Sequence, residues 1–292
     1  MQLRFATHGA AAGWAAVQRS ASPFLVGSEE SVLHDMTHHA ATLARYVVVE
    51  DGAVLGLTRV RAAASLREVR VMLQVHADHR GRGVGTRLLE QALRVADGRS
   101  LAGVVNGDDY SVAVSDHWGF ARERSHRIST VDPREAPAPR ATPEGLAVVP
   151  LATLDAALVW ACLQEVALDD PSGLTRPVPL AEFLDTEWSD PLHRADLGRA
   201  AVTADGTVAA YAQITAADDR AWNAMTGTLP AYRGRGLATL VKAHALAACA
   251  AAGITSCGTG NDDANAPMLA VNGVLGYRPS AVTWSARRPA GA

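Results

Sequence analysis

The sequence predicts a mixed α/β fold, a mixed β-sheet with flanking helices, that occurs twice in the chain. One observation is a repeated string: Val75–Gly85 reads VHADHRGRGVG and Thr228–Ala238 reads TLPAYRGRGLA, 153 residues later. A second pair, Gly119 and Gly276, each followed by an aromatic residue, recurs at an offset of 157 residues. Two landmarks with nearly equal offsets indicate duplication of a whole domain. The length of 292 residues also fits two domains of ordinary size.

The elements of the first half follow from its hydrophobic periodicity. Tyr46–Val49 and Ala53–Val60 are β-rich runs separated by an Asp-Gly pair, which predicts a hairpin. Val69–Val75 is an apolar strand that leads into the glycine-rich turn. Thr86–Ala96 carries apolar residues at helical spacing, and Leu101–Val105 is the next strand.

The second half repeats this order. Val202 and Val208–Ile214 flank a second Asp-Gly pair, which predicts another hairpin. A strand around Trp222–Leu229 enters the second glycine-rich turn. The helix that follows runs through Ala252 and is stopped by a glycine, and Ile254–Cys257 is the next strand.

A proline-rich segment, VDPREAPAPRATPEG at 131–145, separates the two copies and holds four of the fourteen prolines. Proline removes a backbone donor and disfavours helix in the residue before it, so this segment is predicted to be a semi-rigid linker. The predicted organisation is therefore a first domain at 1–132, a linker at 133–145 and a second domain at 146–292.

Composition excludes several classes of function. No apolar run reaches the length of a membrane span, and the first residues do not resemble a signal peptide, so we expect a cytoplasmic protein. The net charge is −3 with no basic block, and Lys242 is the only lysine beside 26 arginines, so nucleic acid is not an expected partner. His34 and His38 are spaced for one helix face but lack a third ligand, so no metal site is expected.

The glycine-rich turn carries the clearest chemistry. A turn between a strand and a helix presents unpaired backbone N–H groups at a helix N-terminus, where the helix dipole adds positive charge. Glycines allow a ligand to approach closely, and the arginines add charge-assisted contacts, so each turn is predicted to bind a phosphate or pyrophosphate. The spacing matches neither the P-loop nor the dinucleotide-binding fingerprint.

These motifs carry a family resemblance. Arg-x-x-Gly-x-Gly/Ala after a strand, with Gly-Phe/Tyr some 35 residues later, resembles the GCN5-related N-acetyltransferase (GNAT) superfamily. Residues 259–277, TGNDDANAPMLAVNGVLGY, resemble the ending common in actinobacterial tandem acetyltransferases. The two-copy layout is similar to that of the mycothiol synthase type, although no substrate motif ties the chain to that reaction.

The resemblance implies acetyl-CoA as the cofactor. The glycine turns would hold its pyrophosphate and the preceding strand its pantetheine arm, and Asn265 resembles an asparagine that contacts this arm. A backbone N–H at the strand end, within Gln74–His76 or Gly227–Leu229, would polarise the thioester carbonyl during direct attack by an amine. The implied contacts of the first copy are Val75, His76, Arg80, Gly81, Arg82, Gly83, Val84, Gly85 and Thr86. Those of the second copy are Thr228, Leu229, Arg233, Gly234, Arg235, Gly236, Leu237, Ala238 and Thr239.

The catalytic groups of this family are less fully represented in the sequence than its cofactor-binding motif. Many members place a tyrosine four residues before the second landmark glycine, where this chain has Ser115 and Asn272. An asparagine can donate a hydrogen bond to the departing thiolate but cannot protonate it. The catalytic candidates are therefore Asn272, the backbone of Leu229, and Glu68, an acid at the start of the first-copy strand.

The second copy is favoured as the catalytic one because its motif is fuller and acids crowd its front segment. Residues 165–190 hold seven acids and one arginine, and Asp169, Asp170 and Glu182 are the candidate substrate contacts. Such a surplus attracts a cationic amine, for example an aminosugar, a polyamine or an antibiotic-like amine, although a solvated acidic surface explains it equally well. The first copy is expected to bind cofactor without turnover.

Two alternatives remain open at this point. One is acetylation of a thiol-conjugate precursor, as in mycothiol synthesis. The other is a non-catalytic acyl-CoA-binding module, which the missing tyrosines favour. The two copies allow a monomer with an internal pseudo-dimer or a homodimer, with a small-molecule amine as the expected partner.

Overall fold

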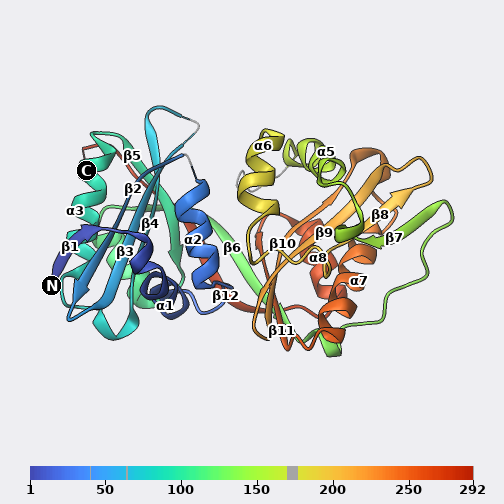
Figure 1. The fold of residues 1–292 in the computed structure, drawn as a ribbon, viewed down its shortest axis with the longest axis horizontal. Coiled ribbons are helices and arrows are strands. Elements are labelled where there is room, and N and C mark those ends of the chain that lie inside the picture. The colour runs from blue at the N-terminus through green and yellow to red at the C-terminus, as the bar shows by residue number, and fades with distance from the viewer. Residues whose placement is uncertain (40, 64, 170–176, 292) are drawn as a thin grey trace. The chain divides into compact units, whose positions relative to one another are not determined.

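The computed structural model describes residues 1–39, 41–63, 65–169 and 177–291. The chain forms two compact units (Figure 1). The first unit consists of Met1–His126 and Ala281–Ala292, and the second of Arg127–Ser280. Both units contain a mixed sheet with helices, so the predicted mixed α/β class is confirmed.

The first unit is built around one sheet. Its strands are β1 (Gln2–Phe5), β2 (Thr42–Glu50), β3 (Ala53–Ala62), β4 (Glu68–Val75), β5 (Ser100–Asn106), and parts of β6 (Ala121–Val131) and β12 (Arg278–Arg288). The strand order is β1-β2-β3-β4-β5-β12, with β6 beside β12. Its helices are α1 (Ala11–Ala21), α2 (Glu29–His38), α3 (Val84–Ala96) and α4 (Asp109–His117). β4 and β5 run parallel, which requires the crossover helix α3 between them.

Alternation along the strands distributes the core of this unit over both faces of the sheet. Val47 packs with α1 and α2, whereas its neighbour Val48 packs with α3. Successive strand residues point to opposite faces, so β2 contributes to two apolar clusters. Trp14 of α1 and Leu88 of α3 are buried at the centres of these clusters.

The second unit repeats this plan. Its own strands are β7 (Leu146–Pro150), β8 (Arg199–Thr203), β9 (Val208–Ala217), β10 (Arg220–Thr228) and β11 (Ser256–Asp262). The strand order is β11-β10-β9-β8-β7, with β6 beside β11, and β10 and β11 run parallel. Its helices are α5 (Ala156–Ala167), α6 (Leu180–Phe183), α7 (Leu237–Ala251) and α8 (Ala266–Val274). Helix α7 packs on one face of this sheet and α5 on the other.

The predicted hairpins form at both Asp-Gly pairs. Asp51 and Gly52 both adopt positive φ, 49° and 81°, which suits the twist of a two-residue hairpin turn. In the second unit Gly206 has a φ of 87° between β8 and β9. Within the described ranges, no helix combines the length and apolar character needed to cross a bilayer.

The ends of the compact units differ from the repeat boundaries drawn on the sequence. Strand β6 leaves the first unit after His126, and strand β12 enters it at Ala281. Thr283–Arg288 of β12 pair antiparallel with Leu101–Asn106 of β5. The last strand of the chain therefore completes the sheet that the first 126 residues begin. Residues 133–145 lie in the second unit, where Pro133–Glu135 form a short 3-10 turn.

Candidate functional site

The two Arg-Gly-Arg-Gly turns have the same backbone conformation. Gly81 and Gly234 have φ of 72° and 75°, and Gly83 and Gly236 have φ of 76° and 75°. Nothing lies within 4 Å of a Cβ built on any of these glycines, so the requirement for glycine comes from the positive φ. The repeated sequence therefore encodes a repeated geometry.

Each turn ends at an uncapped helix N-terminus. Helices α3 and α7 begin directly after Gly83 and Gly236, and neither receives a side-chain cap. By contrast, α4 is capped by Asp108 and α8 by Asn265. The first N–H groups of α3 and α7 have no intrahelical acceptor, so they are arranged to bind an anion.

A gap opens in the sheet of the second unit beside its turn. β10 pairs with β11 only over Arg220–Trp222, and the two strands then separate. At this point a β-bulge between Asn223 and Met225 leaves Ala224 without a partner on β9. Ala224 is exposed at the start of the gap.

The corresponding gap of the first unit differs. β4 and β5 pair only over Glu68–Arg70, but β4 stays in continuous register with β3 and has no bulge. Ser22, after α1, accepts hydrogen bonds from Gln74 Nε2 at 3.1 Å and from Asn106 Nδ2 at 3.3 Å. A polar bridge thus links the separated strands of the first unit.

Two of the N–H groups expected to polarise a thioester, those of Leu229 and His76, are already used at the strand ends. Leu229 N–H donates to Ala209 O at 2.9 Å, and His76 N–H donates to Leu55 O at 2.9 Å. Leu229 therefore has no free backbone donor for a thioester carbonyl in this structure. Sequence reasoning missed the bulge at Ala224, because cross-strand register creates it and no local residue signal marks it.

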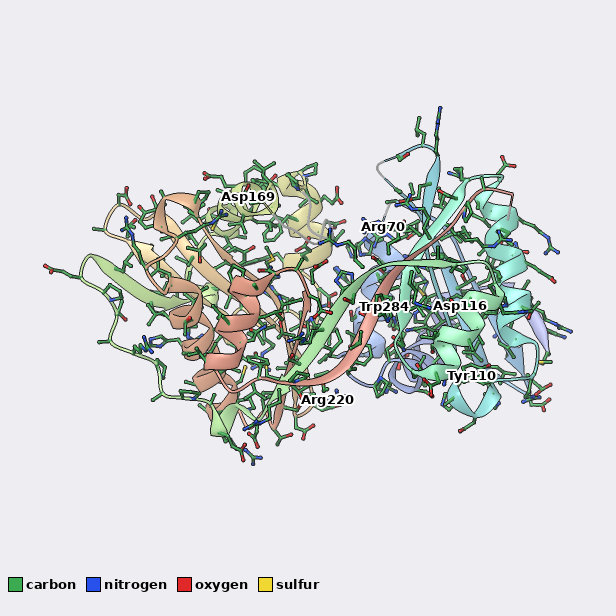
Figure 2. The ribbon with its side chains drawn as sticks, turned by 180° about the vertical axis from the view of Figure 1, so that it is seen from behind. Arg70, Tyr110, Asp116, Asp169, Arg220 and Trp284 are labelled. Atoms are coloured by element: carbon green, nitrogen blue, oxygen red, sulfur yellow. The ribbon has the colours of Figure 1, made fainter. Side chains whose placement is uncertain are left out.

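The second turn brings together a predicted phosphate contact and a predicted substrate contact. Arg233 Nη1 donates to Asp169 Oδ2 at 2.9 Å, and Arg233 Nε donates to Thr228 O at 3.2 Å. Asp169, labelled in Figure 2, follows α5 and is 54% exposed. An exposed ion pair contributes at most about 1 kcal/mol, so a phosphate can replace Asp169 at Arg233. Asp170 lies outside the described residues, and Glu182 occupies a half-buried position on α6.

The first turn is partly occupied by Tyr110 of α4 (Figure 2). Gly81 N–H donates to Tyr110 Oη at 3.3 Å, and the Arg80 guanidinium lies 4.9 Å from the centre of the tyrosine ring. Arg82 pairs with Glu50 at 2.5 Å. Sequence reasoning missed Tyr110, although an aromatic residue in the first turn of the next helix was a usable signal.

The remaining turn residues divide between packing and ligand contact. Val84 and Leu237 are buried in the core, so only their N–H groups can face a ligand. A Cβ on Gly85 would lie 2.8 Å from Trp118, which makes Gly85 a packing glycine. Thr228 Oγ1 is buried without a partner among the described residues. The other predicted contacts, Val75, Thr86, Arg235, Ala238 and Thr239, lie at the strand end, in the turns or in the first helical turns.

Asn272 belongs to a buried polar chain. Its Oδ1 accepts from Lys242 Nζ at 2.6 Å, and its Nδ2 donates to Asn261 Oδ1 at 2.6 Å. Lys242 is 2% exposed and lies over the Tyr277 ring, and burial lowers its pKa to about 7. Asn265 Oδ1 accepts from Met268 N–H at 3.2 Å, which leaves its NH₂ group for a ligand.

Glu68, a candidate base, is held in an ion pair. Its carboxylate binds Arg287, which also binds Glu123 at 2.9 Å. This pairing leaves Glu68 less suited to accept a proton from a substrate. Across the described part of the chain, no group of three or more His, Cys, Asp or Glu side chains is placed to hold a metal ion.

Comparisons with known proteins agree with this geometry. A family model described as "Acetyltransferase (GNAT) domain" matches residues 42–118, and one described as "Acetyltransferase (GNAT) family" matches residues 160–273. No curated protein matches the sequence significantly.

Solved structures resemble the whole chain. A tandem GNAT protein from the clavulanic acid biosynthesis pathway, in a structure without acetyl-CoA, has a TM-score of 0.76 at 22% identity, covering 100% of this chain and 99% of its own. A GCN5-related N-acetyltransferase from Sphaerobacter thermophilus has a TM-score of 0.73 at 18% identity, covering 98% and 95%. A putative acetyltransferase from Pyrococcus horikoshii has a TM-score of 0.63 at 11% identity, covering 99% and 89%. The repeated turns, the uncapped helices and the two family matches together show that the chain belongs to the GNAT family and carries two GNAT domains in tandem.

Proposed function

We propose that the chain is an acetyl-CoA-dependent N-acetyltransferase whose second domain is catalytic and whose acceptor is a small cationic amine. The observation that carries this proposal is the arrangement beside β10. The uncapped N-terminus of α7 follows the glycine turn, and the bulge at Ala224 lies where β10 and β11 separate. Both features are needed to hold a phosphate at one end of the strand and a thioester farther along it.

The residues of the second domain fit the cofactor. The N–H groups at the start of α7 would bind the pyrophosphate, and Arg233 would exchange Asp169 for a phosphate oxygen. The pantetheine arm would lie along β10 in the gap, and the NH₂ group of Asn265 would contact its amides. When bound, acetyl-CoA supplies an activated acetyl group.

For acetyl transfer to an amine, the protein mainly has to orient the reactants and stabilise the negative charge that develops on the carbonyl oxygen. The acceptor amine first loses its ammonium proton to water, and its neutral nitrogen then attacks the acetyl carbon. Ala224 N–H is the candidate donor to the oxygen that becomes negative. The C–S bond breaks, and the proton that the new amide nitrogen loses balances the charge of the departing thiolate. The leaving thiolate has a pKa near that of cysteine, so departure without a strong acid is chemically acceptable. This tolerance accounts for an asparagine at position 272.

The proposed acceptor class rests on charge. Residues 177–190 contain four acids and no basic residue. Their negative potential would draw a protonated amine toward the domain. Asp169 contributes less than its charge suggests, because Arg233 partly neutralises it.

The first domain is proposed to bind cofactor without turnover. Tyr110 occupies part of its turn, and Ser22 bridges its separated strands. Its strand β4 also lacks the bulge that β10 has. These contacts leave a phosphate site but no open acetyl site.

A matched pair of variants tests the assignment. Gly236→Val and Gly83→Val place the same strained residue at the same backbone conformation, so their folding costs are comparable. With acetyl-CoA and a panel of aminosugars, polyamines and basic peptides, Gly236→Val is expected to lower CoA release at least tenfold, because it blocks the anion site. Gly83→Val is expected to retain turnover, and the reverse result would move catalysis to the first domain.

A non-catalytic acyl-CoA-binding module is the second candidate. It is favoured by Asn272, whose amide is committed to Lys242 and Asn261. Calorimetric binding of acetyl-CoA without CoA release across the whole amine panel would support it over the transferase.

A further inference from the structure

Four arginines gather on one face of the first-unit sheet, and together they form the arginine patch (Arg45, Arg59, Arg61 and Arg70). In the antiparallel register Arg45 lies opposite Arg59, and Arg61 lies opposite Arg70. Residues two apart on a strand share a face, so all four guanidinium groups lie on the same side. Like charges directly opposite each other destabilise a sheet, so two adjacent pairs of this kind call for a compensating feature.

The described residues supply only part of that compensation. Asp35 of α2 accepts from Arg45 Nη2 at 3.0 Å and from Arg59 Nη1 at 2.5 Å. Arg61 Nη2 donates to His39 Nδ1 at 2.9 Å, and His39 Nε2 lies 3.1 Å from Asp35. Burial and the charge of Arg61 lower the pKa of His39 to about 4, so this imidazole is neutral at neutral pH.

The arginine patch therefore keeps a surplus of positive charge, although most of its side chains are half-buried. The side chains of Arg45 and Arg59 are only 13% and 19% exposed, and one carboxylate balances three guanidinium groups there. Burial and the charge of Arg59 lower the pKa of Arg61, as expected for crowded cations. The Nε atoms of Arg45 and Arg59 are buried with no acceptor among the described residues.

Arg70, labelled in Figure 2, adds a further charge to the patch. It is exposed and has no ion-pair partner in the described part of the chain. Glu68, the nearest acid along β4 on this face, is bound by Arg287. Arg70 is also the last residue of β4 that pairs with β5, so the patch borders the gap between these strands.

The second domain shows that the fold does not need these charges. Arg70 is the last residue of β4 that pairs with β5, and its counterpart at the end of the β10–β11 pairing is Trp222. Thr215 pairs with Trp222 as Arg61 pairs with Arg70, so the second domain has threonine and tryptophan where the first has two arginines. Because the repeated sheet is built there from half-buried uncharged residues, the arginines serve something other than folding.

We propose that the arginine patch of the first domain binds a small dianion, either a dicarboxylate or a phosphate monoester. Guanidinium groups bind both carboxylate and phosphate oxygens through paired hydrogen bonds, and two negative charges neutralise most of the surplus that four arginines and one carboxylate leave. The site lies apart from the glycine turn, since the arginines stand at the opposite end of β4. The proposal does not depend on the proposed acetyl transfer.

The test uses the intact chain in calorimetric titrations with succinate and with inorganic phosphate at low ionic strength. The double variant Arg61→Thr and Arg70→Asn removes both charges, and threonine is the residue that the second-domain sheet carries at the position of Arg61. Arg94→Gln, on α3, removes an exposed charge from the other face and serves as the control. The wild-type protein is expected to bind at least one anion, with affinity about tenfold or more lower in the double variant and unchanged in the control.

The titrations with succinate and with phosphate distinguish the two classes of ligand, and they distinguish the arginine patch from the glycine turns. Binding of succinate identifies dicarboxylates, and phosphate binding that the double variant loses identifies phosphate esters. Phosphate binding that survives unchanged in the double variant belongs to the glycine turns and overturns the proposal if succinate also fails to bind. The ligand-free double variant is expected to melt at or above the wild-type temperature, because repulsion is removed. Should it unfold, the exposed single variant Arg70→Asn repeats the comparison.

Discussion

At the scale of single residues, Lys242 is the most informative side chain. It is the only lysine in a chain with 26 arginines, and it is buried with its Nζ on Asn272 and over Tyr277. An arginine keeps its charge under all ordinary conditions, whereas a buried lysine can lose its proton. A lysine at position 242 therefore fits a buried site that accepts a side chain able to lose its proton but not an arginine, whose charge is permanent.

The pKa of Lys242 predicts a pH-dependent stability. Burial lowers this pKa to about 7, so above pH 7 the folded chain releases a proton that the unfolded chain keeps. Stability from this group therefore rises with pH, by up to about 1.4 kcal/mol per unit. Between pH 7 and 8.5 the free energy of unfolding of wild type is expected to gain about 1 kcal/mol or more relative to Lys242→Met.

Urea denaturation at several pH values measures this difference. Lys242→Arg serves as a contrasting variant, because its charge cannot be removed and it should be destabilised at every pH. Parallel stability profiles for wild type and Lys242→Met would show that Lys242 keeps an ordinary pKa.

Residue identity alone did not reveal which partners the candidate site residues have in the fold. Asp169 was predicted as a substrate contact, but the fold brings its carboxylate to Arg233. Leu229 was predicted as a backbone donor, but its N–H is bonded to Ala209. Both outcomes depend on partners 64 and 20 residues away, which no local pattern specifies.

At the scale of elements, the sequence predicted most of the fold. The strand–turn–helix order around both glycine turns is present, and α3 begins two residues before the predicted start at Thr86. Periodicity and glycine placement are local properties, so the sequence carries them directly. The bulge of β10 is different, because it exists only relative to the register of β9.

That bulge predicts a selective loss of turnover. Ala224→Pro removes one N–H at a position where proline is tolerated, since bulge residues are free of the strand ladder. If this N–H stabilises the oxyanion, turnover falls by about 100-fold or more while acetyl-CoA affinity stays within a few-fold. Ala224→Ser keeps the N–H and should keep the rate. Equal rates for the two variants, both folded by circular dichroism, would exclude Ala224 as the donor.

At the scale of the whole molecule, the main feature is a strand exchange: the last strand, β12, pairs within the first unit, and the end of β6 belongs to the second. The repeat in the sequence divides the chain once, between its two copies, whereas the compact units divide it twice, at 126/127 and 280/281. Each copy ends in a strand of similar pattern, so sequence alone does not show which of them pairs with β5. Long-range pairing selects β12, and Arg287 reinforces it through ion pairs to Glu68 and Glu123.

This exchange predicts that the end of the chain stabilises its beginning. Truncation after Ser280 removes Thr283–Arg288 from the sheet of the first unit and leaves β5 as an unpaired edge. The first unit is expected to lose amide protection in β4 and β5 by hydrogen exchange, while the turn and helix α7 of the second unit stay protected. Truncation after Arg288 keeps the paired strand and is the matched control. A synthetic peptide of residues 281–292, added in excess, should restore protection of β5, because it replaces the missing strand. Full protection of β5 in the shorter chain without peptide would show that the first unit is complete without the last strand.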